Sequence, residues 1–308
     1  MKNRITSIPE KIILLVAVFL MCSGCLKKNG REILDRSGRT VTVNGKINRI
    51  ISTAPSNTEI IADLGLAYKL VAVDRYSSNV CEYTGGLPLL DFFYPDAELI
   101  ITLKPDIIIA SGHNATGTGE DPFRLLREMG IAVVYIPMSK SIDDIYRDIS
   151  FVADILDAKE SGEELVRSTQ EQIAAIAEKT ASIENKRTVY FEISAAPEMV
   201  TFGKDSFIND MINVIGARNI FADDSWIVSP GAESIIDRNP DVILTNVNYI
   251  PDPIGEIKSR PGFDHINAVI NNRICLIDND SSVRPSARII TALRQMSQAV
   301  YPELYEQQ

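Results

Sequence analysis

One unit of sequence occurs twice in this chain. Residues 98–110 and residues 233–245 each begin with a Glu that lies seven residues before a Pro-Asp pair. In both copies a short amphipathic segment precedes the pair, and an all-apolar run follows that is typical of a parallel strand buried on both faces. A helix, a Pro-Asp turn and a strand are a common α/β connection, but this connection does not explain a Glu in the same register in both copies. We therefore expect two related lobes.

A long predicted helix, residues 161–183, separates the two copies. Small or apolar residues recur along it in steps of three and four, at Leu165, Thr169, Ile173, Ile176, Thr180 and Ile183. This spacing predicts one buried stripe on an α-helix. Ser161 and Glu164 form an S-x-x-E pattern that predicts a capping box at its start. At about 1.5 Å per residue the helix would be roughly 33 Å long, about the diameter of a small domain.

Predicted strands and helices alternate on both sides of this helix. Strand-like runs lie at 49–53, 70–73, 107–110 and 131–136 before it, and at 188–193, 242–245 and 273–277 after it. This order predicts an α/β fold with two Rossmann-like lobes, mainly parallel sheets and one long α-helix that joins the lobes. Ligands of such sheets bind beyond the carboxyl ends of the strands, so we expect a ligand cleft between the lobes. The predicted boundaries are 41–158 for the N-terminal lobe, 159–185 for the linking helix and 186–308 for the C-terminal lobe.

The N-terminus predicts an exported protein. Three basic residues, Lys2, Arg4 and Lys11, lie before or at the start of a short apolar run, residues 12–21. A basic start followed by such a run is typical of a signal peptide, and the run is too short for a typical membrane span. We therefore expect residues 1–24 to be a signal peptide.

The residues after this run resemble a bacterial lipobox, in which the final Cys becomes the lipidated first residue. Ser-Gly-Cys ends at Cys25, and Cys22 stands where a Leu is usual. Ordinary secretion with cleavage nearby is the alternative. With a lipidated Cys25, residues 25–40 would form a tether, and the protein would be anchored outside the cytoplasm on the bacterial cell membrane.

Charge and reactive residues argue against several functions. The formal net charge is −10, and because residues 1–24 carry +2, the remainder carries −12. An acidic body does not suit nucleic acid, whose phosphates are bound by Lys and Arg. The two His residues, His113 and His265, lie in different predicted lobes, and the sequence contains neither a complete dinucleotide fingerprint nor a G-x-S-x-G elbow. We expect no catalytic residue, no metal site and no cofactor.

Cysteine usage does not indicate a disulfide scaffold. The sequence has four Cys, of which Cys25, Cys81 and Cys275 remain after the expected processing. A bridge between Cys81 and Cys275 would tie the two lobes together, so we expect both to be free thiols.

The candidate ligand contacts are aromatic and polar residues that come just after predicted strands. They are Asn57, Arg75, Tyr76, Phe92, Phe93, His113 and Asn114 in the first lobe, and Phe202, Trp226, Asn248, Tyr249 and Arg284 in the second. Aromatic rings would cover the apolar faces of a large chelate, and Arg would pair with its anionic groups. Structural alternatives are packing for the Phe residues, a structural role for His113 instead of coordination of haem iron, and pairing of Arg284 with Asp278 or Asp280.

Several of these segments together resemble the substrate-binding proteins of the iron-siderophore and vitamin B12 ABC importers. The resemblance covers roughly residue 40 to the C-terminus and is carried by residues 49–65, the two Glu…Pro-Asp units, residues 203–211 and residues 216–219. It implies lobes bridged by a single long helix, and one surface Glu on each lobe that docks on Arg residues of the membrane permease. Those positions fall on Glu98 and Glu233.

Three functions remain open on these grounds. The favoured one is a monomeric, lipid-anchored receptor, without enzymatic activity, that captures a ferric siderophore and delivers it to an ABC permease dimer; cobalamin and haem are the alternative ligands. The second is an extracytoplasmic enzyme with a two-lobed cleft, which lacks a catalytic constellation in the sequence. The third is a structural or sensory lipoprotein that binds no small molecule.

Overall fold

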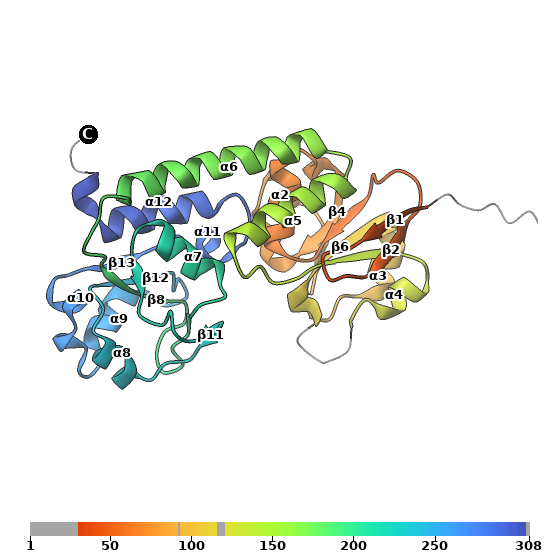
Figure 1. The fold of residues 1–308 in the computed structure, drawn as a ribbon. Coiled ribbons are helices and arrows are strands. Elements are labelled where there is room, and N and C mark those ends of the chain that lie inside the picture. Colours follow the sequence, from red (N-terminus) through yellow and green to blue (C-terminus); the bar gives the residue numbers. More distant parts are fainter. Residues whose placement is uncertain (1–29, 92, 116–120, 306–308) are drawn as a thin grey trace, which may run out of the picture.

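The computed structural model describes residues 30–91, 93–115 and 121–305 and shows two lobes joined by one long helix (Figure 1). Each lobe is built on a parallel β-sheet with helices on both faces, which confirms the predicted α/β fold with two lobes. Within these ranges, no helix combines the length and the apolar character needed to span a membrane.

The N-terminal lobe contains a five-stranded sheet in the order β5-β4-β3-β6-β7, and all neighbours are parallel. The strands are β3 (Ile50–Ser52), β4 (Leu70–Asp74), β5 (Leu89–Leu90), β6 (Ile107–Ser111) and β7 (Ala132–Ile136). Side chains of a strand point alternately to its two faces, and each face packs on its own apolar cluster. One cluster includes side chains of α2 (Pro55–Asp63) and α5 (Ile142–Ile155), and the other includes those of α3 (Ala97–Leu103) and α4 (Arg124–Glu128).

The C-terminal lobe contains a four-stranded parallel sheet in the order β10-β8-β12-β13. The strands are β8 (Thr188–Glu192), β10 (Arg218–Asn219), β12 (Val242–Thr245) and β13 (Ile274–Leu276). One face packs on α7 (Phe207–Val214) and α12 (Ile289–Val300), and the other on α8 (Ala232–Arg238), α9 (Pro253–Ser259) and α10 (Asn267–Ile270). A short helix, α11 (Asn279–Val283), comes just before α12.

The repeated sequence unit has the same structure in both lobes. The short helices α3 and α8 end at Lys104 and Asn239, which both adopt a left-handed conformation, with φ of 46° and 40°. The next Asp in each unit accepts a backbone N–H at the start of the neighbouring strand: Asp106 at 2.7 Å just before β3, and Asp241 at 2.9 Å at the first residue of β8. The Pro-Asp pair thus joins the ends of two adjacent strands in each sheet.

The linking helix is α6 (Lys159–Thr180), which extends along both lobes (Figure 1). Thr169, Ile173, Ile176 and Thr180 are buried, which confirms this part of the predicted stripe, whereas Leu165 is half-buried and Ile183 lies beyond the end of the helix. The helix begins two residues earlier than predicted, because a turn at Asp157, with φ of 57°, ends α5 and the chain becomes helical again at once. The predicted capping box at Ser161 and Glu164 is therefore wrong: both residues lie inside the helix, and its N-cap residue, Ala158, makes no side-chain cap.

A close approach of α5 and α6 depends on Gly162. A β-carbon at this position would collide with the β-carbon of Ala153 in α5. The absence of a side chain therefore allows the start of α6 to pack directly on α5.

A two-stranded antiparallel hairpin precedes the first sheet. It consists of β1 (Arg31–Leu34) and β2 (Thr40–Val43), so part of the segment expected to be a tether is a strand. The carboxylate of Asp35 accepts the backbone N–H of Tyr135 in β7 at 3.0 Å. The hairpin is thereby attached to the edge of the N-terminal lobe.

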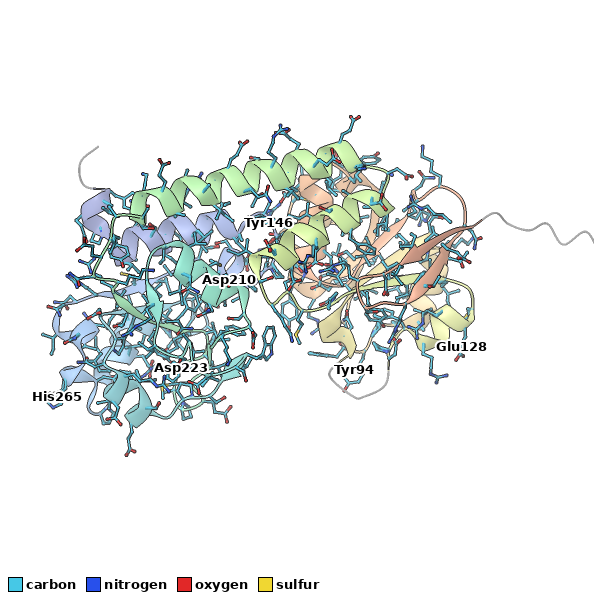
Figure 2. All side chains as sticks on the ribbon, in the orientation of Figure 1. Tyr94, Glu128, Tyr146, Asp210, Asp223 and His265 are labelled. Carbon is cyan, nitrogen blue, oxygen red and sulfur yellow. The ribbon has the colours of Figure 1, made fainter. Side chains whose placement is uncertain are left out.

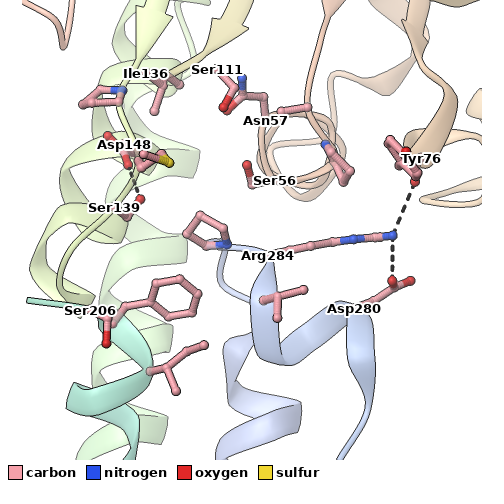
Figure 3. A pocket seen from close by; sticks show the side chains of 18 of the residues that line it. Ser56, Asn57, Tyr76, Ser111, Ile136, Ser139, Asp148, Ser206, Asp280 and Arg284 are labelled. Carbon is pink, nitrogen blue, oxygen red and sulfur yellow. Dashed lines mark hydrogen bonds and ion pairs between the residues drawn. The ribbon is translucent and has the colours of Figure 1, made fainter. Parts of the chain in front are cut away.

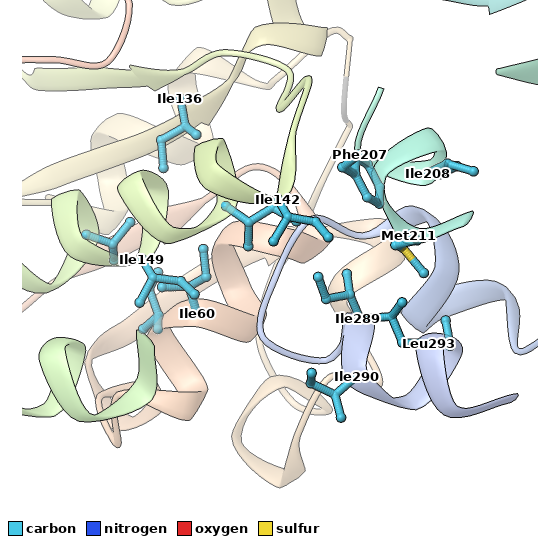
Figure 4. Packing of buried hydrophobic residues seen from close by; sticks show 14 of the residues in the cluster. Ile60, Ile136, Ile142, Ile149, Phe207, Ile208, Met211, Ile289, Ile290 and Leu293 are labelled. Carbon is cyan, nitrogen blue, oxygen red and sulfur yellow. The ribbon is translucent and has the colours of Figure 1, made fainter. Parts of the chain in front are cut away.

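Apolar packing is continuous between the two lobes. One cluster of buried side chains contains Ile60, Ile142 and Ile149 of the N-terminal lobe together with Met211 and Ile289 of the C-terminal lobe. Figure 4 shows these side chains between the helices of the two lobes. Because interiors of this kind pack densely and have few voids, the lobes share a core beneath the cleft and do not meet only at a flexible hinge.

Candidate ligand cleft

A cleft of about 580 Å³ lies between the two lobes. This size lies within the usual range for small-molecule sites. On the N-terminal side it is lined by the start of α2, by Tyr76 and by the loop after β7; on the C-terminal side it is lined by the start of α7, by Trp226 and by residues around α11 (Figure 3). Six of the sequence-predicted contacts lie in this lining: Asn57, Tyr76, Phe202, Trp226, Asn248 and Arg284.

Two aromatic rings form an apolar part of the C-terminal wall. Phe202 and Trp226 contact each other edge to face, with ring centroids 6.0 Å apart. Phe202 is the last residue of β9 (Thr201–Phe202), and Trp226 directly precedes β11 (Ile227–Val228). These two strands pair antiparallel. Gly203 allows this pairing, because a β-carbon there would collide with the backbone of Asp224. A small two-stranded sheet therefore carries both rings to the cleft.

The backbone of Trp226 is strained. Its φ is 56°, in the left-handed region that bulky residues rarely adopt. Two hydrogen bonds hold it there: its N–H donates to the carbonyl of Lys204 and its carbonyl accepts the N–H of Gly203, both at 2.8 Å. Such strain costs of order 1–3 kcal/mol and is found preferentially at functional sites. The geometry places a half-buried indole at the cleft in a fixed orientation.

Arg284 belongs to an ion-pair network that joins the lobes. Its guanidinium donates to Glu59 of α2 at 2.9 Å, to the backbone carbonyl of Tyr76 at 3.3 Å and to Asp280 at 2.7 Å (Figure 3). Ser286 donates to the second oxygen of Glu59 at 2.6 Å. The alternative pairing of Arg284 with Asp280 is confirmed, whereas Asp278 instead caps α11.

Glu59 is almost fully buried, with 1% of its surface exposed. Burial raises the pKa of its carboxyl above the ordinary value, while the hydrogen bonds from Ser286 and Arg284 act in the opposite direction. A carboxyl in this position depends on its partners, because an unpaired buried charge is strongly unfavourable. Arg284 is thus a structural element of the cleft floor.

Asn57 also has structural contacts. Only 1% of its surface is exposed, and its amide donates to the carbonyl of Ile109 in β6 at 3.4 Å. Asn114 is buried in the same region, where it accepts the hydroxyl of Thr53 at 2.7 Å. Both amides thus help to fix the ends of β3 and β6 behind the cleft.

Sequence reasoning missed Asp148, which forms part of the N-terminal wall. It is 1% exposed, and its carboxylate accepts Arg36 at 2.7 Å and Ser139 at 2.9 Å. These bonds hold the loop after β7, which contributes residues 137–139 to the lining. The sequence did contain a signal, because Asp148 follows Ile145 by three residues and so lies on the apolar face of a predicted helix.

Four of the predicted contacts that the structure describes lie outside the cleft lining: Arg75, Phe93, Asn114 and Tyr249. Arg75 pairs with Asp91 at 2.6 Å at the surface. Phe93 lies in a separate surface hollow. Tyr249 is 62% exposed, and its hydroxyl accepts the N–H of Ala195 at 2.8 Å. Adjacency to a strand end predicted all four, but the partners described above hold Arg75, Asn114 and Tyr249 outside the lining.

Several sites fall partly or wholly outside what the structure describes. Cys25 and Phe92 lie outside the described residues, and so does the side chain of His113. Cys81 and Cys275 are free thiols, as expected. In the described part of the chain, no group of three or more His, Cys, Asp or Glu side chains is arranged to hold a metal ion.

Glu98 and Glu233 occupy equivalent places in the two lobes. Each is exposed in the first turn of its helix, α3 or α8. Neither carboxylate forms an ion pair with any residue that the structure describes. Tyr94, which lies three residues before α3, and α8 are both on the side of the molecule away from α6 (Figures 1 and 2). The two Glu residues are therefore accessible to a partner.

Known proteins resemble this chain over most of its length. Residues 50–281 match a family model described as "Periplasmic binding protein". An uncharacterized ABC transporter substrate-binding lipoprotein of Bacillus subtilis, YvrC, is 31% identical over 280 residues, which is 89% of this chain and 86% of that protein. A vitamin B12-binding protein of Vibrio parahaemolyticus is 26% identical over 251 residues, 81% of this chain and 88% of that protein.

A solved structure is also similar. It is that of a possible iron-binding (periplasmic solute-binding) protein from Staphylococcus epidermidis, with a TM-score of 0.75 and 34% sequence identity. The match covers 83% of this chain and 100% of that chain.

The wall residue Asp148 makes stability depend on pH. Burial raises the pKa of its carboxyl from 3.8 to about 6, although Arg36 and Ser139 oppose the shift. As the pH rises, the carboxyl of Asp148 therefore loses its proton at a lower pH in the unfolded chain than in the folded protein. Its contribution to stability is complete below about pH 4 and is lost as the pH rises through about 6. The free energy of unfolding should increase by about 1 kcal/mol from this group when the pH falls from 7 to 5.

Chemical denaturation at both pH values would measure this increase. In Asp148→Asn the increase should be smaller by that amount, and in Asp154→Asn, an exposed position on the same helix, it should be unchanged. An equal pH dependence in Asp148→Asn and the unmodified protein would contradict the account.

Proposed function

We propose that this chain, which belongs to the periplasmic binding protein family, captures a metal chelate in its cleft and delivers it to the permease of an ABC transporter. Family membership makes the chain an ABC transporter substrate-binding protein that binds a solute, and the family is one of transport proteins that are not enzymes. The ligand, its contacts, the docking residues and the anchor are parts of the proposal.

The observation that carries the choice of ligand class is the aromatic wall of the cleft. Phe202 and Trp226 expose ring surface to a space of about 580 Å³ that is otherwise lined mostly by apolar residues. Rings of this kind cover large apolar or flat ligand faces, and a few polar groups fix the ligand's orientation. A ferric siderophore suits such a wall, and a similar solved protein is titled as possibly iron-binding.

Cobalamin is the second candidate. The relative from Vibrio parahaemolyticus is named a vitamin B12-binding protein and is similar over 81% of this chain. A corrinoid also presents a large, largely apolar face, so the same two rings would contact it.

Docking on the permease is assigned to Glu98 and Glu233. Their support is the shared position in two equivalent units, their exposure and the lack of ion-pair partners among the described residues. A carboxylate in the first turn of a helix is also favourable by itself, since it interacts with the helix dipole. In the proposed function, the two carboxylates have a further role: each pairs with Arg residues of the permease.

Anchoring is assigned to Cys25. Its support is the lipobox-like sequence that ends at this residue and the similar Bacillus subtilis protein, which is named a lipoprotein. The hairpin β1–β2 begins at Arg31, so the tether would run from Cys25 to this hairpin.

Ligand capture is testable through Trp226, the single tryptophan of the sequence. A ferric hydroxamate siderophore or cobalamin that binds beside the indole should quench its fluorescence in a saturable way. Replacing Phe202 with Ala should weaken that binding about 10- to 100-fold, because burial of an aromatic side chain contributes about 1.5–3 kcal/mol. The exposed Tyr68→Ala serves as the matched control with unchanged affinity.

Thermal unfolding of Phe202→Ala should first show that the variant is folded, because Phe202 also packs against the core. Failure of both ligand classes to bind the unmodified protein would contradict the proposed function. If folded Phe202→Ala and the unmodified protein bound the ligand with equal affinity, the aromatic wall would not contribute to ligand binding.

Docking predicts a separation of binding from transport. Changing both Glu98 and Glu233 to Ala should leave ligand affinity in solution intact while uptake by cells falls sharply, and a single change should cost less. Interface charges of this kind mainly set the encounter rate and orientation, so high salt should also weaken binding to the isolated permease. Loss of ligand affinity in the double variant would place the two Glu in the cleft or in folding.

The matched control changes two other exposed carboxylates. Glu163→Ala with Glu171→Ala removes the same charge from α6, on the other side of the molecule. Normal uptake by the Glu98/Glu233 double variant, or equal loss in this control, would show that the docking assignment is wrong.

Anchoring predicts a change in fractionation. Cys25→Ser should move the protein from washed membranes to the soluble fraction, since stable attachment would come from the lipid on this residue. Cys81→Ser removes a thiol without touching the lipobox and should remain with the membranes. Retention of Cys25→Ser in washed membranes would rule out the assignment.

A further inference from the structure

We infer that the cleft selects chelates that carry no net negative charge. The inference rests on the proposed function and narrows its ligand class. It follows from how the charged groups around the cleft are already paired, and it separates uncharged and cationic chelates from anionic ones such as tris-catecholate iron complexes and the dicarboxylate haem.

Among the described residues that line the cleft, three carry a formal charge: Asp148, Asp280 and Arg284. The only cation of the three, Arg284, is engaged by Glu59 at 2.9 Å and by Asp280 at 2.7 Å. A third contact goes to the backbone carbonyl of Tyr76 at 3.3 Å (Figure 3). An anionic ligand would have to compete with two carboxylates for this guanidinium.

A second buried carboxyl group, that of Asp74, lies near Arg284. Asp74 at the end of β4 is fully buried and close enough for Arg284 to act on its ionisation. With Glu59, it places two buried carboxyl groups beneath the cleft floor. Burial raises the pKa of both carboxyls above their ordinary values, and neither group offers an anionic ligand a favourable charge.

Among the described residues, three other cations lie near the cleft but outside its lining: Arg36, Lys140 and Lys204, which follows Phe202 by two residues. Arg36 pairs with Asp148 at 2.7 Å on the outer side of the wall. Lys140 lies over the ring of Trp226, with its ammonium 5.9 Å from the ring centroid, so it bridges the lobes beside the cleft.

The first turn of α2 offers the cleft only a partial positive charge. Ala54 caps this helix without a side-chain hydrogen bond, so backbone N–H groups of the first turn remain for other acceptors. A helix N-terminus corresponds to about half an elementary charge, which suits the carbonyl and hydroxyl oxygens of an uncharged ligand. It does not replace a full cation, and burial of an unpaired anion is strongly unfavourable.

A matched series of one chelate tests the inference. Ferrioxamine B carries a free terminal amine and is cationic, its N-acetyl derivative is uncharged, and its N-succinyl derivative is anionic, with the same iron centre. Cyanocobalamin and its monocarboxylic acid form a second pair, uncharged and anionic. Binding would be measured by quenching of Trp226 fluorescence and checked by equilibrium dialysis at fixed ionic strength.

In whichever series binds, the anionic member should bind about tenfold or more weakly than the uncharged one. Equal or tighter binding of the anionic member would overturn the inference and leave the proposed function in place. No binding of either series would overturn the proposed function, and the inference with it.

Asp280→Asn tests the assignment to the Arg284 network. The substitution removes one competitor for Arg284 and leaves the pair with Glu59. The ratio of affinities between the uncharged and anionic members should narrow about threefold to fivefold, since the side chain of Asp280 is partly exposed. Asp264→Asn removes the same charge beside His265, at the far end of the C-terminal lobe (Figure 2), and should leave the ratio unchanged. An unchanged ratio in Asp280→Asn would overturn the assignment.

Discussion

The buried ion pair between Glu59 and Arg284 holds the two lobes in one arrangement. Glu59 comes from α2 of the N-terminal lobe, Arg284 from the segment just before α12, and their 2.9 Å contact is supported by Ser286. Removing one partner of such a pair typically costs 3–5 kcal/mol, because the other charge remains buried and unpaired. The pair therefore specifies the relative position of the lobes more than it adds to net stability.

Other contacts between the lobes act in the same direction. The carboxylate of Asp210 in α7 accepts the backbone N–H of Ile142 at the start of α5, at 3.0 Å. Arg288 donates to Asp63 at 3.0 Å, and the continuous apolar cluster of Figure 4 also joins the lobes. With the unbroken helix α6 behind them, the lobes have little freedom to rotate. A preformed cleft loses less conformational freedom on binding, and it keeps Glu98 and Glu233 at a fixed separation for the docking proposed above.

The sequence was most informative where regular patterns repeat. The two Glu…Pro-Asp units, the apolar strands and the stripe of α6 predicted the fold class and the cleft between lobes, because periodic burial is encoded locally. The capping pattern placed the start of α6 at Ser161, two residues after the observed start at Lys159, because a left-handed turn at Asp157 decides where the helix begins. For the site, Phe202 and Trp226 were correctly expected at the cleft, although Phe202 ends β9 and Trp226 precedes β11, so neither follows a strand. The sequence could not show that Arg284 is paired with Glu59, 225 residues away, or that Asp91 holds Arg75 at the surface, because such partners are set by tertiary structure.

The central claim is that the lobes form one rigid body with a preformed cleft. Small-angle X-ray scattering of the protein without ligand and with a saturating chelate measures this directly. The account predicts nearly the same radius of gyration in both states, since a continuous α6 and the Glu59–Arg284 pair permit only a small closure. A marked compaction on ligand binding would contradict it.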